Sequence, residues 1–186
     1  MNFPQRFFGH LSTITKHRWL VFRHCVKAGI VRQGLTHDLS KYSPTEFWQG
    51  VKYFQGWRSP NVGERNAEGV SRAWLHHKGR NRHHYEYWYD FIPELKTYGP
   101  VPIPMRYIVE MFCDRVAACK VYQKDAYRDD SALVYYQTRR DCDEMHEYSR
   151  TVLEKLLRML AEKGEDETFA YIRTLDLKTK YWTEEK

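Results

Sequence analysis

Apolar side chains recur at helical spacing along most of this chain, and Gly and Pro interrupt the stretches that carry them. The first stretch covers residues 6–31, where one helical face would carry Phe7, Leu11, Ile14, Val21 and Cys25. A second helix is predicted from Pro44 to about Tyr53, because Ser43 and Glu46 have the spacing of a capping box at its start. The residues just before Ser43 therefore lie in a connection between two helices.

The middle of the chain is predicted to form two short helices behind a surface loop. The loop carries the turn formers Gly56, Pro60 and Gly63. The helices are predicted over residues 67–78 and 83–91. Their apolar stripes would turn His77 and His84 inward, which leaves His76 and His83 to face solvent or a substrate.

The last part of the chain is also predicted to be helical. Prolines at positions 100, 102 and 104 make residues 98–104 a stiff connector. The helix after it would have one face made of Tyr107, Met111, Asp114, Ala118 and Val121. A polar loop near residues 125–131 precedes two more helices within residues 132–175, the longer of which should end at Gly164. These helices would complete the core, so the predicted fold class is all-α.

Composition narrows the class of protein. A chain of 186 residues that is 42% hydrophobic can bury one core, so one domain over residues 1–186 is predicted. The four cysteines form no Cys-x-x-Cys pair and no leader pattern opens the chain, which favours a cytoplasmic location. The apolar stretches are too short for a membrane span. The net charge of +6, much of it between Arg72 and Arg82, favours anionic ligands.

The adjacent pair His37-Asp38 is the strongest chemical signal in the sequence. An imidazole and a carboxylate side by side can bind one divalent ion, and this mixture of donors suits iron, manganese, nickel or zinc. Asp114 is a second carboxylate, placed on an otherwise apolar stripe. Burying it there is costly unless it is paired or binds a metal, so we expect it to join the same site.

Three histidines of the first predicted helix compete for a place in this site. They recur every seven residues, at His10, His17 and His24. Two helical turns separate neighbours by about 10 Å, so at most one of them can bind the ion. We choose His17, which lies between Ile14 and Val21 on the apolar face, and expect the other two to be core or partly exposed histidines.

The phrase His37-Asp38-Leu39-Ser40-Lys41 resembles the dyad of the HD-domain superfamily of metal-dependent phosphohydrolases. Cys113-Asp114-Arg115 resembles the phrase that carries the last metal-binding Asp of that superfamily. More narrowly, the segment from Ala73 to Trp88 is similar to an uncharacterised family of bacterial and phage proteins, an offshoot of the same superfamily, in which the position of His17 is also a histidine. The resemblance covers roughly residues 15–120 and implies an HD-domain-like helical bundle with a central metal site, without naming a substrate.

These residues predict one or two divalent transition metal ions. The first ion would be held by His17, His37, Asp38 and Asp114. A second would be held by His77, His84 and a bridging Asp38, because Gly79 lets the chain fold back between the two histidines. Which member of each pair, His76/His77 and His83/His84, binds an ion stays open at this point.

A metal-dependent phosphohydrolase follows from such a ligand set. A metal-bound water would attack a small phosphate monoester, with a nucleotide as the first choice. We assign catalytic roles to Asp38, Lys41 and Glu46. We assign substrate contacts to Lys41, Arg80, Arg115, His76 and His83. Glu86 is a further candidate for proton transfer.

Two other functions fit the same residues. An HD-type scaffold with extra histidines could hold two irons and act as an oxygenase. Alternatively, a basic protein of this kind could bind nucleic acid and use its metal for structure alone. The expected partner is a small anionic phosphorylated substrate, with nucleic acid as the second choice and no membrane. The sequence leaves the oligomeric state open.

Overall fold

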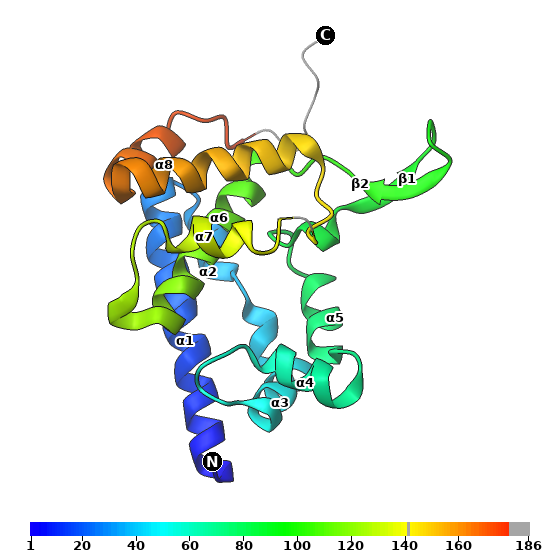
Figure 1. Ribbon diagram of the computed structural model, residues 1–186, viewed down its shortest axis with the longest axis vertical. Coiled ribbons are helices and arrows are strands. Elements are labelled where there is room, and N and C mark those ends of the chain that lie inside the picture. Colours follow the sequence, from blue (N-terminus) through cyan, green and yellow to red (C-terminus); the bar gives the residue numbers. More distant parts are fainter. Residues whose placement is uncertain (141, 179–186) are drawn as a thin grey trace.

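Helices make up most of residues 1–140 and 142–178, the part of the chain described by the computed structural model (Figure 1). The eight α-helices of these residues are α1 (Phe3–Ala28), α2 (Val31–Thr36), α3 (Pro44–Tyr53), α4 (Pro60–Glu68), α5 (Arg72–Lys78), α6 (Met105–Gln123), α7 (Ser131–Gln137) and α8 (Glu147–Ile172). A two-stranded sheet stands beside them. The protein is therefore mostly helical, as predicted, and the small sheet is the departure from the all-α prediction.

The first helix is split where a single one was predicted over residues 6–31. Asn2 and Gln5 form a capping box at the start of α1. Gly29 then ends the helix, because it adopts a left-handed conformation with φ +83°, and α2 begins two residues later. The break turns the chain back, so that α2 packs against α1 and leads into His37.

The hydrophobic core lies where α1, α6 and α8 pack against one another, and Figure 1 shows α8 crossing one end of α1. Its fully buried side chains include Val21, Ile108, Phe112, Val116, Leu153, Leu156 and Leu157. The C-terminal helices therefore complete the core as predicted. Gly164 interrupts the last helix as predicted, because its backbone is non-helical with φ +79°, and a second helical segment follows it to Ile172 within α8.

The helix predicted over residues 67–78 is two helices. Pro60 starts α4 at a position expected to be loop, since its fixed φ suits the first turn of a helix. Gly69 ends α4 in a left-handed conformation with φ +76°. The buried carboxylate of Glu64 then caps α5 by accepting hydrogen bonds from the Ser71 hydroxyl at 2.6 Å and the Arg72 backbone N–H at 3.1 Å.

The helix predicted over residues 83–91 is wrong. A 3-10 turn at Tyr85–Tyr87 is followed by β1 (Tyr89–Ile92), which pairs antiparallel with β2 (Thr97–Pro100). The two strands project from the helices as a hairpin in Figure 1. A short run of aromatic residues fits either structure by periodicity, and Pro93 disfavours helical backbone at the residue before it.

Two smaller predictions concern the connections. The connector predicted over residues 98–104 is correct only in part: residues 98–100 belong to β2, and the segment from Val101 to Pro104 has no regular structure and leads into α6. The loop predicted near residues 125–131 contains a short 3-10 turn at Lys124–Ala126. No helix in the described residues combines the length and the apolar composition that crossing a bilayer requires.

Gly34 allows α2 to approach α1 closely. A Cβ atom at this position would lie 2.7 Å from Cys25 Cβ and 3.2 Å from Phe22 Cα. We expect Gly34→Ala to lower the free energy of unfolding by about 1–3 kcal/mol, because the two helices must move apart. Urea denaturation measures this. Gly79→Ala is the control, since its added methyl would meet only Leu75 O at 3.4 Å, and an equal stability of both variants would contradict the close packing.

Candidate metal centre

The dyad lies in the connection between α2 and a 3-10 turn at Leu39–Tyr42. Asp38 has a left-handed backbone with φ +53°, which is uncommon for a residue other than glycine. The Arg18 guanidinium holds this connection by donating to the carbonyl oxygens of His37 at 2.8 Å and Leu35 at 3.1 Å. Such a conformation persists only where its surroundings hold it, and it turns the Asp38 carboxylate into the protein.

Three side chains, those of His17, His37 and Asp114, gather on the side of one oxygen of this carboxylate. Asp38 Oδ2 lies 3.3 Å from His37 Nε2 and 3.8 Å from His17 Nε2. Asp114 Oδ1, from α6, lies 2.9 Å from His17 Nε2 and 3.6 Å from His37 Nε2. The predicted first ligand set of His17, His37, Asp38 and Asp114 is therefore brought together, with one donor atom of each within 4.8 Å of the others.

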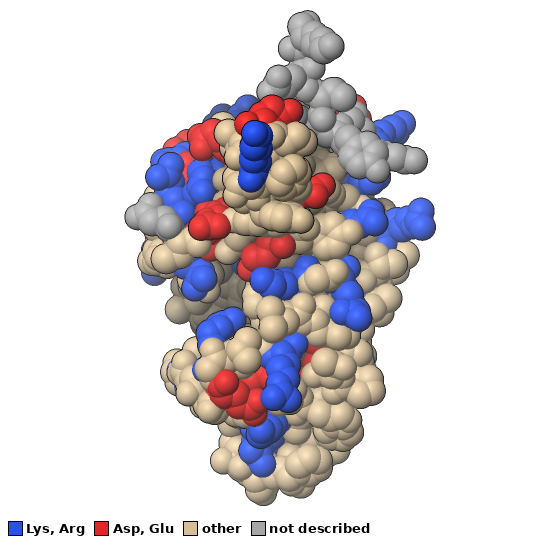
Figure 2. Space-filling model, turned by 90° about the vertical axis from the view of Figure 1, so that its right-hand side faces the viewer, with Lys and Arg blue, Asp and Glu red and all other residues tan. Residues whose placement is uncertain are grey.

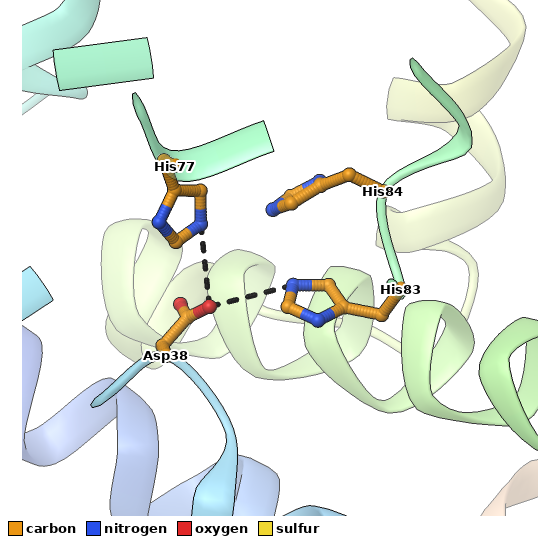
Figure 3. Close-up of side chains that lie close together, drawn as sticks. All are labelled: Asp38, His77, His83 and His84. Atoms are coloured by element: carbon orange, nitrogen blue, oxygen red, sulfur yellow. Dashed lines mark ion pairs between the residues drawn. The ribbon is translucent and has the colours of Figure 1, made fainter. Parts of the chain in front are cut away.

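Three histidines surround the other oxygen. Asp38 Oδ1 lies 3.2 Å from His77 Nε2 and 3.4 Å from His83 Nε2. His84 completes this second set, in which all donor atoms again lie within 4.8 Å. Figure 3 shows the three rings converging on Asp38 from α5 and from the segment that follows it. Asp38 is thus shared by two sets of side chains, one at each carboxylate oxygen.

Most of the atoms that meet here are buried and have no hydrogen bond of good geometry within the described residues. They are both oxygens of Asp38 and the Nε2 atoms of His17, His37, His83 and His84. Asp38 Oδ2 has the Lys41 ammonium group at 2.6 Å, and several of the imidazole nitrogens have the carboxylates of Asp38 and Asp114 as neighbours. Buried polar atoms in proteins are nearly always hydrogen-bonded, so a cluster with so few good hydrogen bonds suits an added cation. Donors bound to one ion at about 2.1 Å lie roughly 3.0 to 3.4 Å apart, close to the spacing within each set. The residues therefore fit a metal ion on each side of Asp38.

Two further carboxylates hold the histidine rings from behind. Glu110 Oε1, on α6, lies 3.0 Å from His37 Nδ1 and 3.2 Å from His83 Nδ1. Glu46 Oε2, on α3, lies 2.8 Å from His77 Nδ1. We call Glu46 and Glu110 the supporting carboxylates. Because they bind the Nδ1 side of each ring, the Nε2 side is free to face Asp38.

The acidic groups of the centre are held in the ionised form. Burial alone would raise the pKa of Asp38, but the charges of His37 and Lys41 hold it well below its usual range. Burial opposes ionisation of Glu110 in the same way, yet the hydrogen bonds of His37 and His83 lower its pKa to about 2. The centre therefore collects negative charge and favours cations.

The pKa values of two histidines of the centre are shifted in opposite directions. Burial alone would lower the pKa of His37, but Asp38, Asp114 and Glu110 raise it well above the usual value. Burial and the neighbouring His83 and His77 lower the pKa of His84. His84 is thus held as a neutral imidazole, the form that binds metal.

Lys41 also belongs to the centre. Its ammonium group lies 2.6 Å from Asp38 Oδ2, and its side chain is 29% exposed. Burial would lower the pKa of Lys41, but Asp38 and Asp114 raise it, so the group stays charged. Lys41 supplies positive charge to Asp38 from the solvent side.

The remaining predicted site residues lie around the centre or apart from it. His76 does not join a ligand set; its Nδ1 lies 2.6 Å from Glu46 Oε1. Arg80 is exposed, with Nη1 bonded to the His76 carbonyl oxygen at 3.3 Å. Arg115 pairs with Asp143 at 3.3 Å, away from the ligand atoms. Glu86 is half-buried, and the described residues place it in neither set.

Two sequence expectations about these residues are corrected. His83 does not face solvent: it is 1% exposed and belongs to the second set, because the chain forms a turn there rather than a helix. The capping box of Ser43 and Glu46 does not form, since Ser43 makes no side-chain cap and the Glu46 carboxylate turns to His76 and His77. The N-cap position of Ser43 and the start of α3 at Pro44 are confirmed.

His10 and His24 are buried histidines outside both ligand sets, as expected. His10 packs against Gly50, where an added Cβ would lie only 2.1 Å from its ring. His24 stacks on Phe169, and its Nδ1 lies 3.3 Å from the Cys113 carbonyl oxygen. Burial and the nearby Lys120 lower the pKa of His24 to about 4, so it is neutral.

The sequence analysis missed Glu110. The signal was present, because Glu110 precedes Asp114 by four residues and so lies on the same face of α6, one turn away. A second carboxylate on an apolar helix stripe deserves the same interpretation as the first. Glu110 contacts His37 of the first set and His83 of the second.

The fold and the centre define a class: a mostly helical protein with buried His, Asp and Glu clusters that could hold metal ions. Comparison of the sequence with protein families identifies the chain further. Residues 6–159 match the Family of unknown function (DUF5662), so the chain belongs to this family. No curated protein matches the chain. No solved structure matches it either.

An ion-pair cluster beside His24 gives a prediction about pH. Glu165 on α8 binds Lys120 and, at 2.8 Å, Lys27. Burial would raise the pKa of Glu165, but these lysines lower it to about 2. The unfolded value is about 4.3, so the stabilisation is complete above that pH and is lost as pH falls toward 2.

We therefore expect the stability difference between the wild type and Glu165→Gln to be largest near neutral pH and to shrink between about pH 5 and pH 2. Urea denaturation at several pH values measures it. Glu167→Gln, which removes a 67% exposed glutamate from the same helix, is the baseline for loss of a surface charge. A difference that grows as pH falls would contradict the ion-pair assignment.

Proposed function

We propose that this protein is a metal-dependent phosphohydrolase of the HD-domain type that acts on a small phosphate monoester. The observation that carries the proposal is the arrangement around Asp38, whose two oxygens each face a separate set of side chains that could hold a metal ion. Two ions bridged by one carboxylate suit the transfer of a phosphoryl group, because each can contact one side of the reacting phosphorus. The likeness to the HD-domain superfamily, carried by His37-Asp38 and Asp114, points to the same chemistry.

The donor types favour a transition metal. The first set offers two imidazoles and two carboxylates, and the second offers three imidazoles and the shared carboxylate. This mixture suits iron, manganese, nickel or zinc, whereas calcium and magnesium prefer oxygen alone. When bound, such an ion would lower the pKa of a bound water so that it ionises near neutral pH. The ion would also polarise a phosphoryl oxygen of the substrate.

A substrate would approach on the side of Asp114 and Lys41. Their side chains are 18% and 29% exposed, whereas Asp38 is 1% exposed. Lys41 would exchange its contact with Asp38 Oδ2 for one with a phosphoryl oxygen once a metal ion takes that carboxylate oxygen. Its ammonium group would then stabilise the negative charge that develops on the phosphoryl group.

Glu46 would act through the residues it holds. Its carboxylate bridges the Nδ1 atoms of His76 and His77, so it positions one histidine of the second set and one outside it. His76 is the more exposed of the two and would serve as the proton donor to a leaving group. Arg80, exposed and one turn further along the chain, would bind more distant anionic parts of a nucleotide.

One observation supports a second candidate. The second ligand set has three histidines and a single carboxylate, a nitrogen-rich environment that also suits iron. An oxygenase with two irons is therefore the alternative, and the oxidation chemistry of the bound metal separates the two. Nucleic-acid binding has less support, since Figure 2 shows basic side chains interspersed with acidic ones among the described residues of that face.

Metal content is the first test of the proposal. The wild type, purified under reducing conditions and reconstituted with manganese or zinc, should hold two ions per chain and hydrolyse phosphate monoesters from a panel that includes nucleotides. Removal of metal by a chelator should abolish hydrolysis. Asp38→Ala should lose both ions, because Asp38 belongs to both sets.

Variants of single ligands should lose one ion each. His17→Ala should lose the ion of the first set, and His84→Ala the ion of the second. His10→Ala is the matched control, because it removes a buried histidine of α1 that lies outside both sets. A wild type without bound metal, or an Asp38→Ala variant that keeps both ions, would contradict the proposal.

Lys41 provides a separate test of the substrate side. We expect Lys41→Met to lower kcat/KM for a phosphate monoester by about 100-fold, the scale seen when one charged contact to a transition state is removed. Metal content should stay at the wild-type value, since Lys41 is no ligand. Arg115→Met is the control, because Arg115 is directed to Asp143. An unchanged kcat/KM in the Lys41 variant would remove its role.

A further inference from the structure

We propose that Glu110 is a positioning residue shared by both ion sites, so that the two sites load as a coupled pair. This inference rests on the two-ion centre of the proposed function. It assigns a role to the buried carboxylate of Glu110, which belongs to neither of the two sets around Asp38. It also explains how two sites that use different histidines are linked, because Glu110 contacts one histidine of each.

The contacts of Glu110 span the two ligand sets. One oxygen, Oε1, lies 3.0 Å from His37 Nδ1 and 3.2 Å from His83 Nδ1. His37 belongs to the first set and His83 to the second. Their ring centroids lie 4.4 Å apart, and both residues are almost fully buried. A shift of either ring therefore moves the oxygen that holds the other.

These contacts set the proton on each ring. A carboxylate at Nδ1 keeps that nitrogen protonated and leaves the lone pair on Nε2, the nitrogen that faces Asp38. His37 Nε2 lies 3.3 Å from Asp38 Oδ2, and His83 Nε2 lies 3.4 Å from Asp38 Oδ1. One outer carboxylate thus prepares one nitrogen ligand for each ion.

Glu110 is itself held in place. Gln33 on α2 donates from Nε2 to Glu110 Oε2 at 3.0 Å and also to the Arg106 carbonyl oxygen at 3.1 Å. The carboxylate therefore accepts bonds on both oxygens. A glutamine at position 110 could not do so, because its amide has a single acceptor oxygen and its NH2 group would face a donor on one side.

Glu46 provides the natural comparison. It supports His77, which belongs to the second set, and His76, which belongs to neither. Loss of the Glu46 carboxylate should therefore disturb one ion, whereas loss of the Glu110 carboxylate should disturb both. The number of ions affected therefore distinguishes a positioning role shared by both sites from a general effect of removing a buried charge.

The experiment is a titration of metal-free protein with Zn²⁺ alone, by calorimetry with a competing chelator, in the wild type and in three matched variants. Glu110→Gln should weaken both ions by about 10- to 100-fold, the usual effect of removing a partner of a metal-binding histidine. Glu46→Gln should weaken one ion by that factor and leave the other. Glu165→Gln, which removes a carboxylate outside both sets, should leave both affinities unchanged.

Two further measurements test whether misfolding explains a loss of metal binding. Glu110→Asp retains the charge but withdraws it from both rings, so it should weaken both ions as well, and circular dichroism reports whether each variant is folded. In zinc-loaded wild type, ¹⁵N spectra of labelled histidine should show His37 and His83 with protonated Nδ1. Glu110→Gln should change both signals, a response that lost stability alone would not produce.

The outcomes are distinct. A wild type with two ions and folded Glu110 variants that weaken one ion or none would overturn the shared role, while the proposed function would stand. A wild type that binds two ions but hydrolyses no phosphate ester would overturn the proposed function and leave the role of Glu110 intact. Fewer than two ions in the wild type would overturn both.

Discussion

The concentration of negative charge around Asp38 is the constraint on which the rest of the centre depends. Four ionised carboxylates meet there, those of Asp38, Glu46, Glu110 and Asp114, and their pKa values all lie below the usual range. Charge buried in this way is tolerated only with a positive partner. Lys41 and protonated histidines can supply part of this positive charge. Two divalent cations would supply four positive charges and displace the protons from the histidine rings. The pattern of hydrogen bonds, in which carboxylates hold Nδ1 and leave Nε2 toward Asp38, is the one that a metal would need.

The packing of the helices positions the side chains of this centre from different parts of the chain. The apolar core aligns α1 with α6, which sets His17 opposite Asp114 at 2.9 Å. His77 comes from α5, and the other candidate ligands, His37, Asp38, His83 and His84, come from connections, where the backbone is free to take unusual conformations. Asp38 has φ +53° there, and Arg18 secures the connection by its backbone carbonyls. The close packing of α2 on α1 at Gly34 places Gln33 within hydrogen-bond distance of Glu110. Helix packing thereby helps to position this supporting carboxylate.

Sequence periodicity could predict the members of the centre that lie on long helices, because it reports which residues share a face. His17 and Asp114 were found in this way, and the dyad was found because its two members are adjacent. The same reasoning failed for His83, since a short aromatic segment fits a helix or a strand equally well and the wrong choice turned its ring outward. It failed for the Glu46 carboxylate as well. A glutamate three residues after Ser43 suits a capping box, and only the tertiary contact with His77, 31 residues away, draws it elsewhere. Distances between helices decide such cases, and one sequence does not contain them.

The most direct test of the account is anomalous diffraction at the zinc edge from crystals of the zinc-loaded protein. The account predicts two peaks per chain, one on each side of the Asp38 carboxylate. One should lie among His17, His37 and Asp114, and the other among His77, His83 and His84. Peaks confined to the protein surface, with Lys41 still the sole cation at Asp38, would contradict it.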